Sequence, residues 1–457
     1  MNAPSKPVPI LAAAVAALAM TACAGRPAPA EATGAGISAT PNGTPSPATG
    51  TPAGVPGTPA GRQLGWLLDA STRAPITEDE LADHFTADFL KAIPPAQLNQ
   101  VLATFKDLKL ERLETSQDRS LVARVLAGAS AFDVALSVDA AGLMTGLRFS
   151  APTPGTWGEV DERLARLSPR TGFLAAELTK DGTCRPVHGV AAGERGPLGS
   201  MLKLYVLGAV AERIGSGAFG WDTELTITPE LKSLPSGELQ DRPDGSRVTV
   251  LEAAKLMISI SDNTATDLLI HKAGRKAVER TMRAWGVRDK RNVPFLTTRD
   301  LFVLKGVGYP RHAKRYLSLN DAGQRAYLDK VVAKAPLSKF AMWSAPRELD
   351  TLEWFASPAE ICRAYAGLVK LGDRRIGEVM SINDGGLGLD KAQWPAVWFK
   401  GGSEPGVSDM SFLARTAQGR TYVVTTMAID RKAPVGGQVG LDQVAVTRGA
   451  FALVKAP

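Results

Sequence analysis

The residues whose types and spacing best suit a chemical reaction are Ser200 and Lys203, at the start of the apolar stretch 199–210. Side chains three positions apart share one helix face, so we expect the Lys203 amine to reach the Ser200 hydroxyl. A serine hydroxyl attacks poorly until a base accepts its proton, and an amine among apolar neighbours has the lowered pKa that such a base needs. The pair predicts an activated nucleophile, although a helix N-cap serine followed by a solvated lysine has the same spacing.

Two later stretches favour the chemical interpretation. Residues 261–263 read Ser-Asp-Asn, and residues 400–402 read Lys-Gly-Gly. Together with the serine and lysine at 200 and 203, they resemble the S-x-x-K, S-D-N and K-T-G motifs of class A serine β-lactamases and penicillin-binding proteins. The resemblance covers about residues 158–456, and it implies a serine hydrolase that works through an acyl-enzyme.

The resemblance also implies a role for each polar residue of the second and third motifs. Ser261 would relay a proton to the leaving nitrogen, Asp262 would hold its loop by hydrogen bonds, and Asn263 would bind a substrate side-chain amide. The Lys400 ammonium would attract a substrate carboxylate and help to poise Ser261. Taken alone, the triplet 261–263 is equally typical of a turn between two helices.

The backbone near the third motif is expected to stabilise negative charge. The resemblance implies an oxyanion hole made by the backbone amides of Ser200 and Ser403. Gly401 and Gly402 would let an acyl substrate lie against the strand. Because Gly401 stands where the family usually has threonine, one hydrogen bond to a substrate carboxylate is lost, and penicillin binding should weaken by about 1 to 2 kcal/mol.

The resemblance fails at the loop that normally carries the deacylating glutamate. Ser357-Pro358 resembles the start of the helix after the omega loop, but residues 347–355 lack the family's glutamate followed by leucine and asparagine. Glu348 or Glu353 could replace that glutamate, or both could be ordinary solvated acids. Without a replacement, we expect a β-lactam acyl-enzyme to hydrolyse slowly.

These motifs require an α/β scaffold that brings distant parts of the chain together. Hydrophobic patterns predict an antiparallel sheet flanked by terminal helices, with a mostly helical insertion at about 216–386. The predicted strands are 172–179, 185–190, 397–400, 411–415 and 421–429, and the terminal helices are 160–167 and 441–454. This is the β-lactamase/transpeptidase-like fold, expected for residues 156–457.

A smaller α+β domain is expected over residues 63–155. Phe85, Phe89 and Ile93 recur at helical spacing, whereas residues 132–138 alternate as in a strand. Its size and order resemble the steroid-isomerase-like (cystatin-like) domain that precedes the lactamase domain in β-lactamase-like proteins of clavulanic acid gene clusters. We expect it to be a spacer or a recognition domain.

The first 62 residues indicate export and anchoring. Residues 1–22 have an apolar run that is typical of a signal peptide, and the small residues before Cys23 resemble the lipobox of bacterial lipoproteins. Residues 23–62 are rich in Pro, Gly and Thr, which predicts a disordered tether from an acylated Cys23. We therefore expect a lipoprotein at the cell membrane that faces the periplasm or cell wall; the alternative is a plain cleaved signal with Cys23 as a free thiol.

Composition excludes several other classes. The chain has 457 residues, 44% of them hydrophobic, and a formal charge of +7 from scattered basic residues, so a nucleic-acid partner is not expected. The four histidines show no metal-ligand spacing, and nothing calls for a metal or cofactor. Cysteine count allows a bridge between Cys184 and Cys362, but two buried free thiols are expected.

Three functions are consistent with these features. The first is an exported, lipid-anchored serine hydrolase acting on a small-molecule ester or β-lactam-type amide. The second is a penicillin-binding-protein-like acyl transferase acting on peptidoglycan stems. The third is a non-catalytic envelope protein whose cleft binds a ligand.

Overall fold

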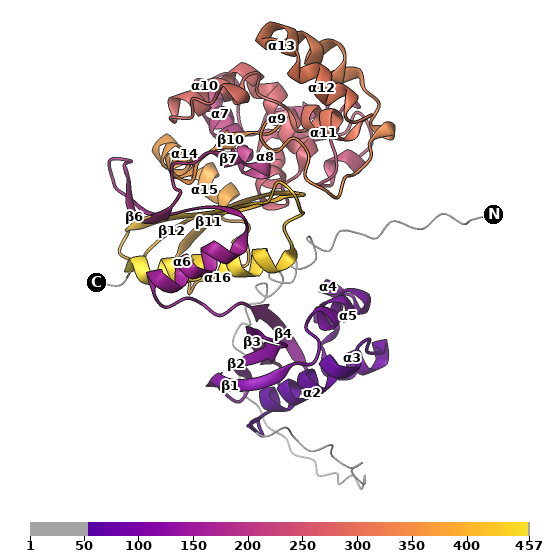
Figure 1. Ribbon diagram of the computed structural model, residues 1–457, viewed down its shortest axis with the longest axis vertical. Helices are drawn as coiled ribbons and strands as arrows, with labels where there is room; N and C mark the ends of the chain where they lie inside the picture. Colours follow the sequence, from indigo (N-terminus) through magenta and orange to yellow (C-terminus); the bar gives the residue numbers. More distant parts are fainter. Residues whose placement is uncertain (1–53, 456–457) are drawn as a thin grey trace, which may run out of the picture. The chain divides into compact units, whose positions relative to one another are not determined.

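The computed structural model describes residues 54–455, which form two units divided after Pro152 (Figure 1). The division lies a few residues before the expected boundary at 155. The expected tether also ends earlier than predicted, because a helix begins at Pro59 with Thr58 as its N-cap. The signal peptide and the Cys23 lipidation site lie outside the described residues.

The first unit is an α+β domain. Its helices are α2 (Pro59–Arg73), α3 (Glu78–His84), α4 (Ala87–Ala92) and α5 (Pro95–Thr104), and its strands are β1 (Lys109–Ser116), β2 (Ser120–Ala127), β3 (Ser130–Val138) and β4 (Met144–Ser150). The strands form one antiparallel sheet in chain order. The single helix expected through Phe85 and Ile93 is two helices, because the Thr86 hydroxyl caps a new helix immediately after α3 ends.

The second unit is built on a five-stranded antiparallel sheet in the order β11-β12-β13-β5-β6. Its strands are β5 (Arg170–Leu178), β6 (Cys184–Val190), β11 (Ala396–Glu404), β12 (Val407–Arg415) and β13 (Thr421–Ile429). The early strand β5 pairs with the late strand β13, so the sheet joins both ends of the unit. The prediction of such a sheet is confirmed.

Helices cover both faces of this sheet. The terminal helices α6 (Trp157–Leu167) and α16 (Gly437–Lys455) lie side by side on one face, where Val160 and Leu164 pack with Phe173 of β5 (Figure 1). Helix α14 (Pro358–Leu371) packs on the other face, where Leu174 of β5 lies. Alternate β5 side chains therefore serve two cores, which is the period-two pattern of a strand buried on both faces.

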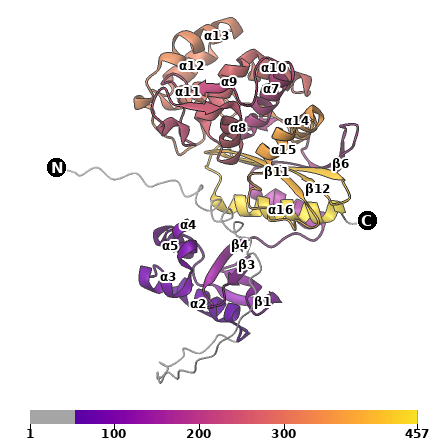
Figure 2. The ribbon, with the colours of Figure 1, turned by 180° about the vertical axis from the view of Figure 1, so that it is seen from behind.

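The helical insertion predicted at about 216–386 is also present, and the helical part of the second unit starts before it, at Lys203. Its helices are α7 (Lys203–Gly215), α8 (Val250–Ser259), α9 (Asn263–Ala273), α10 (Arg275–Ala284), α11 (Thr298–Gly306), α12 (Arg311–Leu317), α13 (Asp321–Lys330) and α15 (Arg374–Met380). Short strands β7 (Gly196–Pro197), β8 (Glu224–Thr226), β9 (Arg247–Thr249) and β10 (Phe355–Ala356) accompany them, with 3₁₀ turns η1 (Gly199–Leu202), η2 (Leu239–Asp241), η3 (Lys290–Asn292), η4 (Val332–Lys334) and η5 (Leu337–Lys339). Figure 2 shows this helical part from behind. None of the helices between residues 54 and 455 is both long and apolar enough to span a bilayer.

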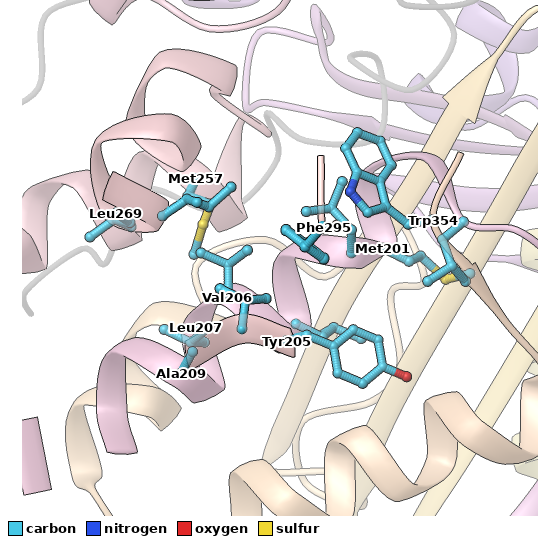
Figure 3. Packing of buried hydrophobic residues seen from close by; sticks show 14 of the residues in the cluster. Met201, Tyr205, Val206, Leu207, Ala209, Met257, Leu269, Phe295 and Trp354 are labelled. Atoms are coloured by element: carbon cyan, nitrogen blue, oxygen red, sulfur yellow. The ribbon is translucent and has the colours of Figure 1, made fainter. Parts of the chain in front are cut away.

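Helix α7 lies at the centre of the helical part. Its residues from Lys203 to Ala211 are all buried, so the helix is enclosed on every side. Figure 3 shows Val206 of α7 near Met257 of α8 and Leu269 of α9. This packing fixes the helix that begins at Lys203.

The two cysteines of the second unit form a disulfide, so the expectation of free thiols is wrong. Cys184 begins β6 and Cys362 lies on α14, and their Cα atoms are 6.2 Å apart. Cysteine count cannot specify a pairing, whereas the packing of α14 against the sheet brings these two together.

Removing this disulfide is expected to destabilise the protein without altering its site. The bridge closes a sequence separation of 178 residues, so it should contribute about 2 to 4 kcal/mol to the free energy of unfolding. The measurement is urea unfolding of the wild type and of a Cys184→Ala/Cys362→Ala variant. A reductant should destabilise the wild type but not the variant; equal unfolding free energies would contradict the expectation.

Candidate active site

Ser200 lies in a tight turn rather than in the α-helix expected from the sequence. Residues 199–202 form the 3₁₀ turn η1, and α7 begins only at Lys203. Gly199 has φ +47°, in the left-handed region that favours glycine. The turn leaves Ser200 half-buried at the start of a buried helix.

Lys203 is a fully buried lysine that contacts the second motif. Its Nζ donates hydrogen bonds to the Ser261 carbonyl oxygen (2.6 Å), Ser261 Oγ (2.9 Å) and Asn263 Oδ1 (2.8 Å). The expected hydrogen bond to Ser200 is not formed within residues 54–455. Lys203 therefore joins η1 to the 261–263 loop.

Asp262 holds that loop as the sequence predicted. Its Oδ2 accepts hydrogen bonds from the backbone amides of Glu238 and Leu239, and its Oδ1 accepts one from the amide of Ala265 in the first turn of α9. These bonds fix Ser261 at φ +60°, a conformation that is costly for a residue with a Cβ. Buried hydrogen bonds thus hold a strained serine facing Lys203.

Asn263 contacts both the lysine and the neighbouring backbone. Only 2% of the residue is exposed, its Oδ1 accepts from Lys203, and its Nδ2 donates to the Leu234 carbonyl oxygen (3.0 Å). Asn263 therefore orients the lysine amine. Because an amide nitrogen has two hydrogens, the expected bond to a substrate amide stays a prediction.

Lys400 of β11 contacts the same serine from the other side. Its Nζ lies 3.1 Å from Ser261 Oγ and donates to the Gly401 carbonyl oxygen at 2.8 Å. The Ser261 hydroxyl thus lies within hydrogen-bond distance of two amines, Lys203 and Lys400, and it can accept from a charged amine or donate to a neutral one. This is the arrangement that a proton relay requires.

The two amines have lowered pKa values. Burial, and then the nearby Lys400 charge, bring the pKa of Lys203 well below its ordinary value, so this amine can be neutral and can accept a proton. Burial lowers the pKa of Lys400 to about 7. Close to neutral pH, the pair can hold one positive charge while one amine acts as a base.

The two glycines of this region allow β11 to lie against the serine turn. A Cβ at Gly402 would overlap the Leu198 carbonyl oxygen and lie 2.7 Å from the Ser200 amide nitrogen. A Cβ at Gly199 would lie 2.9 Å from the Ser403 amide nitrogen. The Ser200 and Ser403 amides, which are expected to form an oxyanion hole, therefore lie at the close contact between β11 and η1.

Neither candidate for the deacylating glutamate hydrogen-bonds Lys203 or Ser200 within residues 54–455, so a role in deacylation stays a prediction. Glu353 is buried and accepts from Lys305 Nζ, and Glu348 accepts from Thr351 Oγ1 at 2.7 Å. No carboxylate among the described residues hydrogen-bonds Lys203. Nor is any group of three or more acid, histidine or cysteine side chains in residues 54–455 arranged to hold a metal ion.

Sequence reasoning missed one charged group next to the site. Glu404 follows Ser403 on β11, and its side chain is 8% exposed. Because side chains alternate along a strand, Glu404 lies on the same face as Lys400 and Gly402. A charged residue at an inward-facing strand position was the signal that could have identified it.

The fold and the site together define a class of protein: the second unit has a class A serine β-lactamase-like fold. Residues 160–327 match the sequence model of the β-lactamase enzyme family, which supports a β-lactamase-like serine hydrolase. Residues 55–144 match a second model, described as the N-terminal part of the ORF 12 gene product. The resemblance of the first unit to a steroid isomerase stays a prediction.

Solved structures similar to this chain are β-lactamases and a penicillin-binding protein. A β-lactamase from Sphaerobacter thermophilus is 20% identical with a TM-score of 0.47, and the match covers 66% of this chain and 98% of that one. PBP-A is 19% identical with a TM-score of 0.44, and the match covers 66% of this chain and 99% of that one. A class A β-lactamase from Mycobacterium abscessus is 16% identical with a TM-score of 0.44, and the match covers 65% of this chain and 99% of that one. Comparison with curated proteins gives no match.

The lowered pKa of Lys400 predicts a pH dependence that differs between substrates. Above pH about 7 the free protein loses the Lys400 charge, so the acylation rate constant for an anionic penicillin should fall, approaching tenfold per pH unit, relative to that for an uncharged nitrophenyl ester. Stopped-flow rates from pH 5.5 to 9 test this. A Lys400→Met variant should show no such divergence; an unchanged ratio in the wild type would contradict the assignment.

Proposed function

We propose that this protein is an exported, lipid-anchored serine hydrolase that forms an acyl-enzyme on Ser200 and acts on small esters. The observation that carries the proposal is the hydroxyl of Ser261 between two buried amines, one of which, Lys203, directly follows the turn that contains Ser200. Export and anchoring rest on the sequence pattern that ends at Cys23.

The proposed acylation uses Lys203 first as a base and then as a proton donor. Lys203, neutral because of burial, accepts the Ser200 proton as Ser200 Oγ attacks the substrate carbonyl carbon. Ser261 donates its hydrogen to the leaving oxygen and recovers one from Lys203, so the amine becomes neutral again. The amides of Ser200 and Ser403 stabilise the negative charge on the carbonyl oxygen.

An ester suits this site better than a β-lactam. After ester cleavage the alcohol departs and leaves room for a water, which the regenerated Lys203 amine can activate. After β-lactam opening the amine stays tethered to the acyl group, and no described carboxylate reaches Lys203 to activate water from elsewhere. We therefore propose ester turnover together with slow release of a penicilloyl group, which would also suit a penicillin-binding-protein-like transferase.

The test compares the wild-type soluble part with Ser200→Ala. Each is mixed with a short-chain nitrophenyl ester, a chromogenic cephalosporin and a fluorescent penicillin, and turnover and intact mass are recorded. Ester turnover that Ser200→Ala abolishes supports the proposal; Ser216→Ala, an exposed serine at the end of α7, is the matched control. A long-lived penicilloyl adduct without ester turnover favours the transferase. If neither an adduct nor turnover is detected, the proposal fails and the non-catalytic binding protein is favoured.

A further inference from the structure

A buried charged cluster made of Lys305, Glu353 and Glu404 lies beside the candidate oxyanion hole. Lys305 Nζ donates to Glu353 Oε1 at 2.9 Å and to Glu404 Oε1 at 2.7 Å. The three side chains are 0%, 1% and 8% exposed. Lys305 comes from α11, whereas its two partners come from the 347–355 loop and from β11.

Each carboxyl group belongs to a segment that borders one of the two amides. Glu353 precedes Trp354, whose carbonyl oxygen accepts from the Leu198 amide at 2.8 Å, just before the Ser200 turn. Glu404 directly follows Ser403 on β11. Through its contacts with Glu353 and Glu404, the Lys305 side chain therefore connects the segment next to the Ser200 turn with the segment next to Ser403.

We propose that Lys305 is a positioning residue that, through Glu353 and Glu404, fixes the separation of the Ser200 and Ser403 amides. This inference rests on the proposed function, because it assigns the two amides to the oxyanion of the same reaction. A hydrogen bond to an oxyanion weakens steeply with distance, so small shifts of either segment are costly.

The charges near the cluster explain why a lysine is needed there. Asp409 of β12 pairs with Gly402, and both its carboxyl oxygens are buried without a hydrogen-bond partner. Burial raises the pKa of Asp409 and of Glu404 well above the usual range. The Lys305 ammonium, which contacts both Glu353 and Glu404, offsets negative charge that would oppose an oxyanion.

Two substitutions of Glu404 distinguish positioning of the amides from a purely structural role of the cluster. Glu404→Gln keeps an oxygen that can accept from Lys305, so it should behave like the wild type. Glu404→Met removes that oxygen but leaves Lys305 paired with Glu353, so no charge is left buried without a partner. Should Glu404→Met not fold, Glu404→Thr offers a short side chain that suits a strand and cannot reach Lys305.

The control is an ion pair away from the site. Arg325 of α13 contacts Glu279 of α10 at 2.9 Å. Arg325→Met should lower the melting temperature but leave acylation and exchange unchanged. For every variant we would measure melting temperature, the acylation rate with the nitrophenyl ester, and hydrogen exchange of peptides that span 198–202 and 400–404. The exchange measurement needs no substrate.

Positioning predicts a specific combination of results. Glu404→Met should slow acylation by about 30-fold or more and speed exchange in both peptides, whereas Glu404→Gln and Arg325→Met should do neither. If Glu404→Met matches Glu404→Gln in acylation and exchange, the inference is overturned. If the wild type is never acylated but both peptides respond to Glu404→Met, the proposed function fails while the connection through Lys305 stands.

Discussion

Replacing Lys203 by methionine is expected to lower kcat/KM for the nitrophenyl ester by roughly 10³-fold. The amine is the only described base that lies between Ser261 and Asn263, and its burial keeps its pKa well below the ordinary lysine value. Methionine has similar length but cannot accept a proton. The measurement is steady-state hydrolysis, with intact mass to detect any acyl-enzyme.

A second substitution separates basicity from charge. Lys203→Arg keeps a cation near Ser261 and Asn263, but a guanidinium does not lose its proton in proteins. We expect a loss as large as that of Lys203→Met. Activity retained in Lys203→Arg would show that Lys203 acts only as a charge, and would contradict its assignment as the base.

Both substitutions must be separated from a loss of folding. Removing the amine leaves Asn263 Oδ1 without its donor, at a cost of about 1 to 3 kcal/mol, whereas the Ser261 oxygens keep their bonds from Ser236 and Lys400. Melting temperatures should therefore be measured with the rates. Lys272→Met, an exposed lysine at the end of α9, is the control that should change neither.

Gly402→Ala is the other change with a large expected effect, about 10² to 10³-fold in kcat/KM. The new Cβ would overlap the Leu198 carbonyl oxygen and lie 2.7 Å from the Ser200 amide nitrogen, so β11 and η1 must separate. Separation would pull the Ser403 amide away from the Ser200 amide. The expected signature is a fall in kcat with little change in KM, since the lost interaction is made mainly in the transition state.

Gly377→Ala is the matched control for this backbone change. Gly377 lies within α15, and a Cβ there meets only Trp398 at an ordinary distance of 3.8 Å. Alanine in a helix should stabilise the protein by about 0.5 to 1 kcal/mol and leave activity unchanged. If Gly402→Ala were as active as Gly377→Ala, the oxyanion hole would not lie at the contact of β11 with η1.

Local patterns predicted much of the second unit. The run of apolar and β-branched residues at 421–429 and the helical spacing along 441–454 identify β13 and α16, because both patterns depend on the sequence nearby. The bond from Asp262 to the first turn of α9 also follows a local pattern, since a short acid before a helix is a typical N-cap. Helix α2 and the strands β1 and β2 were not identified; β1 is largely exposed and has little apolar alternation.

Tertiary contacts overturned several details of the site. The spacing of Ser200 and Lys203 predicted a hydrogen bond between them, but a 3₁₀ turn replaces the first helical turn, and Lys203 contacts Ser261 instead. Glu353 was considered as a base from its place in the loop, whereas Lys305, distant in sequence, binds it within the protein. Neither outcome follows from residues close in the chain.

The sequence by itself determined the three motifs and the strands and terminal helices of the second unit, because each depends on residue types at short separations. Only the tertiary structure decided the Cys184–Cys362 bridge, the hydrogen-bond partners of Lys203 and the connection of Lys305 to Glu404. These contacts join segments far apart in the chain. Their formation depends on which polar groups become buried together, and burial is a property of the packed molecule.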